Sequence, residues 1–215
     1  MRIGVPKEIK VHEYRVGLTP ASVRELVEHG HEVVVETGAG AAIGLGDNAY
    51  GAAGAALAGS AEEVFASAEM IVKVKEPLAP ERARLRAGQI LFTYLHLAPD
   101  PAQAQDLVAS GCVAIAYETV TDARGGLPLL APMSAVAGRM SIQAGAHSLE
   151  LAQGGSGVLL PGVPGVAPGK VVIIGGGVVG TNAAMVALGM GARVVLLERS
   201  VRRIYELDSE FGLRL

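Results

Sequence analysis

Residues 170–200 read KVVIIGGGVVGTNAAMVALGMGARVVLLERS, and this stretch decides the fold. A β-branched apolar run is followed by glycines spaced G-x-G-x-x-G, an apolar helical pattern and a second β-branched run. Gly175 is placed to make the tight turn, Gly177 to let the backbone approach a ligand, and Gly180 to let helix and strand pack closely. The order strand, glycine turn, helix, strand predicts a parallel βαβ unit whose helix begins at an anion-binding site.

Glu198 ends the second predicted strand, where an acidic residue would hold the hydroxyl groups of a ribose. We therefore interpret residues 170–200 as the dinucleotide-binding turn of a Rossmann fold; a glycine-rich turn that binds nothing is the alternative. A carboxylate repels a 2′-phosphate, so Glu198 favours NAD over NADP. Arg199, Arg202 and Arg203 follow at once, and arginine is what a 2′-phosphate requires. Solvated charge on a helix is the other interpretation of this arginine cluster.

Short apolar runs alternate with helical patterns through the rest of the chain. Strand candidates span 2–6, 32–36, 70–75, 90–96 and 112–119, and helix candidates span 19–30, 60–67, 100–111 and 132–152, the last with Ser134 as its N-cap. This alternation predicts an α/β fold of two lobes, each a parallel sheet flanked by helices. We expect a substrate lobe at 1–128 and the first part of a Rossmann domain at 129–215.

Charged side chains follow the apolar runs of the first lobe. Lys75 ends the strand predicted over 70–75, His96 ends the one over 90–96, and Arg15 lies in the loop after the first strand. In open parallel sheets, ligands bind beyond the carboxyl ends of the strands. Arginine clamps a carboxylate, lysine polarises an oxygen, and histidine exchanges protons near neutral pH. The set suits a small carboxylate with a carbonyl or imine next to it.

Each of these side chains also has a structural interpretation. Arg15 would then be a surface charge, Lys75 would extend its ammonium group into water, and His96 would be a structural histidine with its hydrogen bonds made within the protein. A binding module for an anionic metabolite fits almost as well. Lys73 shares a face with Lys75 because strand side chains alternate, but only Lys75 lies at the mouth, so we expect Lys73→Ala to matter far less.

Composition narrows the class of protein. The formal net charge is -3, and no basic stripe indicates nucleic-acid binding. The N-terminus lacks the apolar segment of a signal peptide, and no apolar run is long enough to cross a bilayer. One cysteine excludes a disulfide framework within the chain and is consistent with a reducing compartment. We expect a cytoplasmic protein with no metal site.

Six stretches together resemble alanine dehydrogenases: MRIGVPKEIK, EYRVGLTP, KVKEPL, FTYLHLA, LAPMSAVAGRMS and PGVAPGKVVIIGGGVVGTNAA. The resemblance runs through essentially the whole chain, and KVKEP with YLHLA is more specific than the glycine motif. The NAD(H)-binding component of proton-translocating transhydrogenase shares the architecture, but this pairing of lysine and histidine is not expected there. A non-catalytic NAD-binding or assembly module is the alternative from another class.

The resemblance implies oxidative deamination of L-alanine to pyruvate and ammonia, with NAD as hydride acceptor, in a homohexamer. It implies that Arg15 and Lys75 bind substrate, and that His96, with Lys75, is catalytic. It implies dinucleotide contacts from Ser134, Val178, Val179, Glu198 and Arg203, with Met133 lining the nicotinamide pocket.

The sequence departs from the family pattern in two ways. Glu198 stands where the family leads us to expect aspartate, and the sequence stops at Leu215, about midway through the expected Rossmann domain. In the family, the chain returns to the first lobe after the nucleotide domain. We expect the second active-site carboxylate of the family to lie beyond Leu215.

Overall fold

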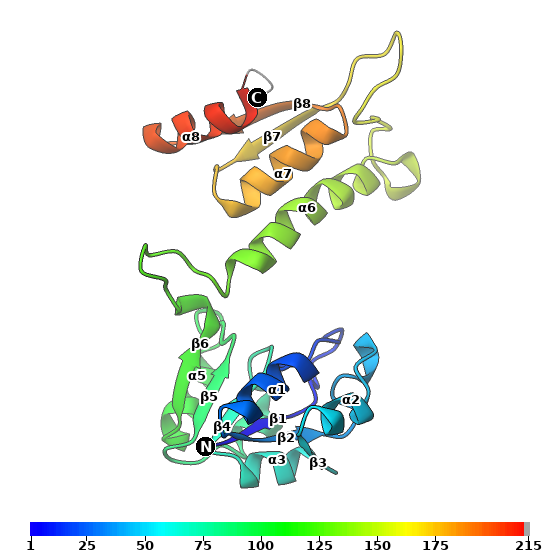
Figure 1. Cartoon of the computed structure of the whole chain (residues 1–215). Helices are drawn as coiled ribbons and strands as arrows, with labels where there is room; N and C mark the ends of the chain where they lie inside the picture. The colour runs from blue at the N-terminus through cyan, green and yellow to red at the C-terminus, as the bar shows by residue number, and fades with distance from the viewer. Residues whose placement is uncertain (213–215) are drawn as a thin grey trace. The chain divides into compact units, whose positions relative to one another are not determined.

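The computed structural model describes residues 1–212, and the chain divides into two compact units, Met1–Gly125 and a second that begins at Gly126 (Figure 1). The strands of the first unit are β1 (Arg2–Val5), β2 (Glu32–Glu36), β3 (Ala56–Ala58), β4 (Met70–Val72), β5 (Ile90–Thr93) and β6 (Val113–Ala116). Its α-helices are α1 (Pro20–Glu28), α2 (Asp47–Ala52), α3 (Ala61–Ser67), α4 (Ala79–Arg82) and α5 (Pro101–Ser110).

The six strands form one parallel sheet in the order β3-β2-β1-β4-β5-β6. The chain builds outward from β1 to β3 and then crosses back to place β4 on the other side of β1. Strand order therefore reverses between β1 and β4, where Ile3 pairs with Met70. Such a reversal opens a crevice at the carboxyl ends of the two strands, because their following segments run in opposite directions.

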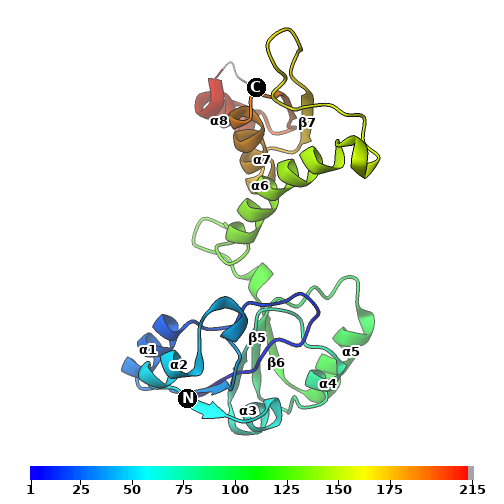
Figure 2. The same ribbon diagram turned by 90° about the vertical axis from the view of Figure 1, so that its right-hand side faces the viewer.

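Two apolar layers cover the two faces of this sheet. Val5, Val35 and Val72 pack with α1 and α2 on one face. Ile71 and Leu91 pack with α3 and α5 on the other (Figure 1). The alternation of side chains along each strand sends neighbouring residues to opposite layers. Helices α4 and α5 lie side by side (Figure 2).

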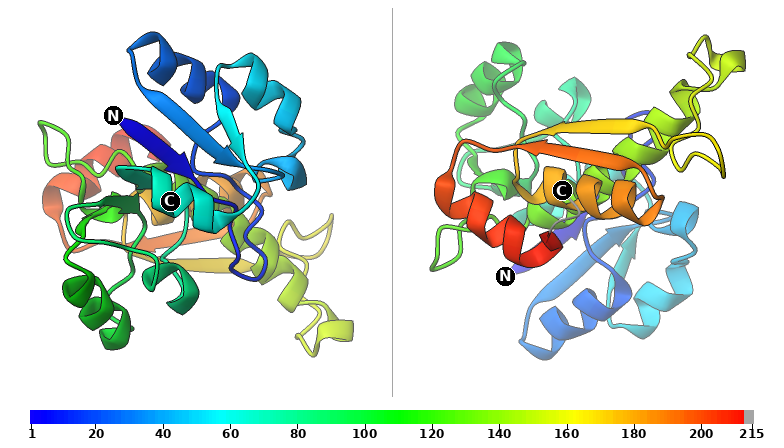
Figure 3. Two further views of the ribbon diagram at one scale, coloured as in Figure 1. Left: turned by 90° about the horizontal axis from the view of Figure 1, so that it is seen from below. Right: turned by 90° about the horizontal axis from the view of Figure 1, so that it is seen from above.

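The second unit contains α6 (Ala131–Ser148), β7 (Lys170–Ile174), α7 (Val178–Gly189), β8 (Arg193–Leu197) and α8 (Val201–Phe211). Strands β7 and β8 pair in parallel, as the glycine-turn motif predicted (Figure 3, right). All three helices contribute to one apolar core against one face of this pair, through residues such as Ile142, Ala184 and Leu207. The opposite face carries exposed side chains such as Ile174. The α/β class with parallel sheets is confirmed.

Glycine permits two close approaches in this unit. A Cβ on Gly180 would lie 1.9 Å from the carbonyl oxygen of Gly175, so α7 packs directly on the turn that follows β7. A Cβ on Gly138 would lie 2.2 Å from the carbonyl oxygen of Val179. Helix α6 therefore contacts the first turn of α7 backbone to backbone.

Several predicted boundaries are wrong. The N-cap of α6 is Leu130 and not Ser134, because Pro132 lies within the first turn, where its missing N–H costs nothing. The helix ends at Ser148, before the predicted residue 152. The strand predicted over 70–75 ends at Val72, although Lys73 and Tyr94 continue its pairing with β5 by isolated hydrogen bonds. Strand β3 was not predicted. Within residues 1–212, no helix is both long and apolar enough to cross a membrane.

Candidate functional site

Three chain segments leave the carboxyl ends of β1, β4 and β5, next to the reversal of strand order. The segment after β1 carries Arg15, the one after β4 carries Lys75, and the one after β5 carries His96. The three predicted side chains therefore share one edge of one sheet.

Arg15 is held by a carboxylate two residues away. Its Nε and Nη2 donate to the two oxygens of Glu13 at 2.8 and 2.6 Å, and its backbone N–H donates to the same group at 2.9 Å. These hydrogen bonds, and a smaller electrostatic contribution from Lys75, lower the pKa of Glu13 to about 2. Glu13 therefore lies within the fields of both cations and orients the guanidinium in the absence of another carboxylate.

Lys75 is half-buried, and among residues 1–212 no hydrogen bond or ion pair involves its ammonium group. Its carbonyl oxygen accepts a hydrogen bond from Thr93 Oγ1 at 2.8 Å, which ties the segment after β4 to β5. Lys73, two residues earlier, is entirely buried and contacts two glutamates. The sequence did not predict this burial, and it argues against our expectation that Lys73→Ala would matter far less.

His96 is oriented by Glu76. His96 Nδ1 lies 3.1 Å from Glu76 Oε2, while the ammonium group of Lys10 pairs with the other oxygen of the same carboxylate. The pKa of Glu76 is lowered despite its burial, because Lys10 and His96 both donate to it. An ionised carboxylate only accepts hydrogen bonds, so Nδ1 carries the proton and Nε2 is left for exchange with a ligand.

Glu118, which the sequence did not single out, holds the backbone at His96. Its carboxylate accepts the N–H groups of Leu95 at 3.0 Å and of His96 at 2.7 Å. His96 has a φ of 47°, in the left-handed region that non-glycine residues seldom adopt. No motif or hydrophobic pattern marks Glu118 in the sequence; its place just after strand β6, at the same edge of the sheet, is the feature that points to it.

Tyr94 connects the arginine to the histidine. Its ring stacks on that of His96 with centroids 5.9 Å apart. Burial raises the pKa of the Tyr94 hydroxyl, and the positive charge of Arg15 acts in the opposite direction. Arg15, Lys75 and His96 thus lie at one edge of the sheet, with Glu13, Tyr94 and Glu76 as their neighbours. The pocket described at this edge is lined by Glu13 and Arg15, and its lining includes neither Lys75 nor His96.

The glycine turn of the second unit offers backbone donors to an anion. Gly175 has a φ of 98°, and Gly177 is the N-cap of α7 with no side chain capping the helix. The first N–H groups of a helix need acceptors, and here no residue of the helix start supplies one from a side chain. Val178 and Val179 are exposed in this first turn. The turn fits a pyrophosphate, and a nicotinamide dinucleotide bound there would supply a hydride acceptor.

Glu198 is fixed beside this turn. One carboxylate oxygen accepts the N–H of Gly176 at 2.7 Å, and the other accepts those of Arg199 and Ser200. These bonds, that from Ser200 foremost, lower the pKa of Glu198. The carboxylate is therefore charged and placed at the end of β8, where a ribose would lie.

Arg203 braces the glycine turn. Its guanidinium donates to the carbonyl oxygen of Gly176 at 2.7 Å, to Thr181 Oγ1 at 2.8 Å and to Glu206 at 2.9 Å. Arg202 pairs with the same glutamate, so two members of the arginine cluster already have partners. The interpretation as purely solvated helix charges is therefore wrong for Arg203. The sequence did not predict the role of Thr181.

Met133 and Ser134 lie in the first turn of α6, and both are half-buried. Ser134 precedes Gly138 by one helical turn and so faces the same side, which is the side that contacts Val179 of α7. The structure thus brings Ser134 near the start of α7. A role for either residue in binding a dinucleotide is untested and stays a prediction.

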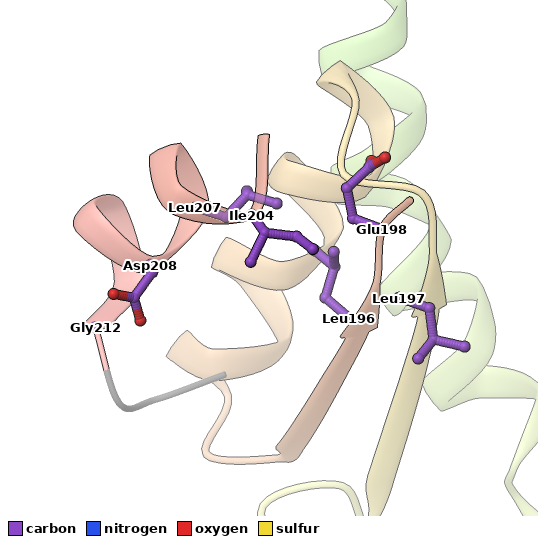
Figure 4. Close-up of a pocket in the computed structure, with 7 residues that line it drawn as sticks. All are labelled: Leu196, Leu197, Glu198, Ile204, Leu207, Asp208 and Gly212. Atoms are coloured by element: carbon purple, nitrogen blue, oxygen red, sulfur yellow. The ribbon is translucent and has the colours of Figure 1, made fainter. Parts of the chain in front are cut away.

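An apolar pocket lies between β8 and α8 (Figure 4). Leu196 points toward Ile204 and Leu207, whereas Leu197 points to the opposite face of the sheet, and Glu198 stands at the rim beside the glycine turn. The walls are apolar apart from the carboxylates of Glu198 and Asp208, and the apolar part suits a flat heterocyclic base attached to a ribose.

Two family models match nearly all of the chain, and a known protein matches all of it. The family "Alanine dehydrogenase/PNT, N-terminal domain" matches residues 4–137, and "Alanine dehydrogenase/PNT, C-terminal domain" matches residues 141–215. An alanine dehydrogenase of Halomonas elongata is 59% identical over 215 residues, which are 100% of this chain and 58% of that protein. An alanine dehydrogenase of Bacillus subtilis is 56% identical over 212 residues, 99% of this chain and 56% of that protein.

Solved structures agree with these matches. An L-alanine dehydrogenase superposes with a TM-score of 0.92 at 55% identity, covering 100% of this chain and 59% of that one. A transhydrogenase from Sinorhizobium meliloti superposes with a TM-score of 0.81 at 25% identity, covering 97% and 62%. The chain thus spans about 58% of the length of the first relative. Both domain models, and matches that cover the whole of this chain, agree: the chain belongs to the alanine dehydrogenase/PNT family.

Proposed function

We propose that the protein carrying this chain is an NAD-dependent alanine dehydrogenase, which oxidises L-alanine to pyruvate and ammonia in a reversible reaction. The carrying observation is the grouping of Arg15, Lys75 and His96 at the reversal of strand order in unit 1. Identities of 55–59% to alanine dehydrogenases, against 25% to the transhydrogenase, favour this activity over the transhydrogenase component.

The proposed roles follow from the contacts of each side chain. Arg15 binds the carboxylate of alanine, and Lys75 lies beside the reacting carbon. A hydride leaves Cα and a proton leaves the amino group, which gives an imine. Water adds to the imine carbon, and ammonia departs. His96 Nε2 moves the protons, because Glu76 occupies Nδ1. NAD, when bound at the glycine turn, would supply the hydride acceptor, and the protein's own residues would orient it.

The cofactor contacts belong to the same proposal. We assign Gly175, Gly177, Val178, Val179 and Gly180 to the pyrophosphate. Glu198 is assigned to the ribose and Ser134, Met133 and Arg203 to the surroundings of the dinucleotide. A cytoplasmic homohexamer is likewise proposed from the family resemblance. These assignments are supported by the geometry of the turn and the close relatives.

The test uses the protein at its natural length, because the chain spans 58% of a relative. Of Arg15, Lys75 and His96, Lys75 is the one whose side chain makes no hydrogen bond or ion pair with a carboxylate among residues 1–212. Lys75→Ala should therefore abolish alanine-dependent reduction of NAD. Lys170→Ala is the matched control, since Lys170 is exposed at the start of β7. NADH binding, followed by fluorescence, should survive both changes.

Two results would count against the proposal. The first is an unmodified protein that reduces no NAD in the presence of L-alanine. The second is a Lys75→Ala protein as active as the parent, which would remove Lys75 from the reaction.

A further inference from the structure

The proposed mechanism makes no use of Lys73. Among residues 1–212, this lysine is the most deeply buried charged side chain. It is 0% exposed, and its ammonium group lies 3.1 Å from Glu8 Oε2 and 2.7 Å from Glu81 Oε1. Both glutamate side chains are 2% exposed. A lone buried ion pair seldom adds stability over apolar side chains of the same size, so the cluster asks for another explanation.

Each glutamate divides its two oxygens between Lys73 and a backbone N–H group. Glu8 Oε1 accepts the N–H of Val74 at 2.7 Å, and Glu81 Oε2 accepts the N–H of Leu78 at 2.8 Å. The ammonium group of Lys73 therefore fixes the two carboxylates that fix the backbone on both sides of Lys75.

The same cluster reaches the segment that carries Arg15. Glu8 belongs to that segment, which leaves β1 and returns to α1. At its other end, a Cβ on Gly17 would lie 2.5 Å from the carbonyl oxygen of Val72, so the segment presses on the end of β4 there as well. Glu8 and Gly17 thus attach the segment to β4 on both sides of Arg15.

We propose that Lys73 is a positioning residue of the alanine site: through Glu8 and Glu81 it fixes the two segments that carry Arg15 and Lys75. This inference rests on the function proposed above. Lys73 contacts no substrate in this account, because it is wholly buried; it acts by holding other groups. Small displacements of such groups cost about 100-fold in rate for each ångström.

The experiment separates positioning from general stability. Glu8→Ala removes the link to the Arg15 segment, yet leaves Lys73 paired with Glu81, so that no buried charge is left without a partner. Lys73→Met is the stronger change and leaves two buried carboxylates unpaired. Glu25→Ala, at an exposed position of α1, is the matched control.

For Glu8→Ala we expect kcat/KM for L-alanine to fall by about 10- to 100-fold. The Kd for NADH should change less than about twofold, because its site lies in the second unit. Amide hydrogen exchange should accelerate in residues 7–17 and 74–78 and stay as in the parent elsewhere. Glu25→Ala should match the parent in all three measurements.

Three outcomes overturn the inference: parental kcat/KM in a folded Glu8→Ala protein, unchanged exchange in both segments, or parallel loss of alanine turnover, NADH binding and melting temperature. The same criteria apply to Lys73→Met where it folds. A parent that does not oxidise alanine would refute the proposed function instead, and hydrogen exchange would still decide whether Lys73 holds the two segments.

Discussion

At the scale of residues, carboxylates decide what each candidate side chain of the crevice can do. Glu13 occupies the fork of Arg15, and Glu76 occupies Nδ1 of His96, while Lys75 has no such partner among residues 1–212. A substrate carboxylate must therefore share Arg15 with Glu13 or displace it. The lysine can meet a ligand without first breaking a contact.

His96→Ala tests proton exchange. If His96 Nε2 moves protons in the rate-limiting step, the rate of alanine oxidation should depend on a group that titrates near neutral pH, and His96→Ala should remove that dependence with at least about a 100-fold loss of rate. The measurement is kcat against pH. His29→Ala, at the exposed end of α1, is the control. An unchanged pH profile in His96→Ala would make the side chain structural.

Glu198→Ser tests nucleotide choice. The charged carboxylate beside the glycine turn should repel a 2′-phosphate, and two of the nearby arginines already have partners. We expect NAD to bind at least about tenfold more tightly than NADP, which corresponds to about 1.4 kcal/mol. Glu198→Ser should narrow or reverse this difference.

Dissociation constants of both nucleotides at one fixed salt concentration make that comparison, because contacts between phosphate and arginine weaken with ionic strength. Tighter NADP than NAD binding by the unmodified protein would show that the arginines, and not Glu198, decide the preference.

At the scale of elements, the contact between α6 and α7 depends on one glycine. A methyl group on Gly138 would meet the carbonyl oxygen of Val179 at 2.2 Å, whereas one on Gly145 in the same helix meets nothing within 4 Å. We expect Gly138→Ala to destabilise the second unit by about 1–3 kcal/mol. Gly145→Ala should be neutral or stabilise it by up to about 1 kcal/mol, through helix propensity.

Urea unfolding followed by circular dichroism, with hydrogen exchange to assign the loss to the second unit, measures both changes. Equal stability of the two variants would mean that α6 moves away from α7 at little cost.

The sequence predicted helices and strands whose apolar residues follow a clear pattern. It did not predict short elements whose formation depends on tertiary contacts. The pattern EVVVE predicted β2 to the residue, because three β-branched side chains lie between turn signals. Strand β3 is Ala-Leu-Ala, and alanine has no strand preference of its own; pairing with β2 creates it. The N-cap of α6 is wrong in the sequence-based prediction, because Pro132 already lies in the first helical turn, two residues before Ser134.

The same contrast holds for the candidate site. Lys75 and His96 were singled out as the ends of predicted strands, which is local information; in the structure β4 ends at Val72 and β5 at Thr93, so both residues lie three positions beyond their strands. The burial of Lys73 was not, because it depends on Glu8, which is 65 residues away in the chain. Alternation along the strand puts Lys73 and Lys75 on one face, but the burial of Lys73 follows from its contacts with Glu8 and Glu81, which are tertiary.

At the scale of the whole molecule, acid should destabilise the protein. The pKa of Glu13 is about 2 in the folded chain against an ordinary value of 4.5, and the pKa values of Glu76, Glu198 and Glu206 are also lowered. The unfolded chain then binds more protons than the folded one between these values. The stability these groups contribute is complete above about pH 4.5 and is lost as the pH falls toward 2.

Glu8 acts in the opposite sense. Burial raises its pKa, so its contribution is present below about 4.5 and is lost as the pH rises through its folded value. We expect the glutamates with lowered pKa values to outweigh Glu8 in the pH dependence of stability. Glu13→Gln should therefore reduce the fall in the free energy of unfolding between about pH 5 and pH 3. Urea unfolding across this range measures it, with Glu25→Gln as the control. The same slope in both variants would exclude Glu13 as a main source.

The residues of the buried cluster, Glu8, Lys73 and Glu81, are synthesised at different times during translation. Lys73 is synthesised 65 residues after Glu8. At about 5–20 residues per second, the ribosome needs about 3–13 s for that interval. During this interval β1 can pair with β2, but the other edge of β1 has no partner until β4 has been synthesised. The last outer strand, β3, ends at Ala58, 15 residues before Lys73 (73 − 58), so the nascent chain contains all three strands of the outer half before it contains the lysine that joins the two halves.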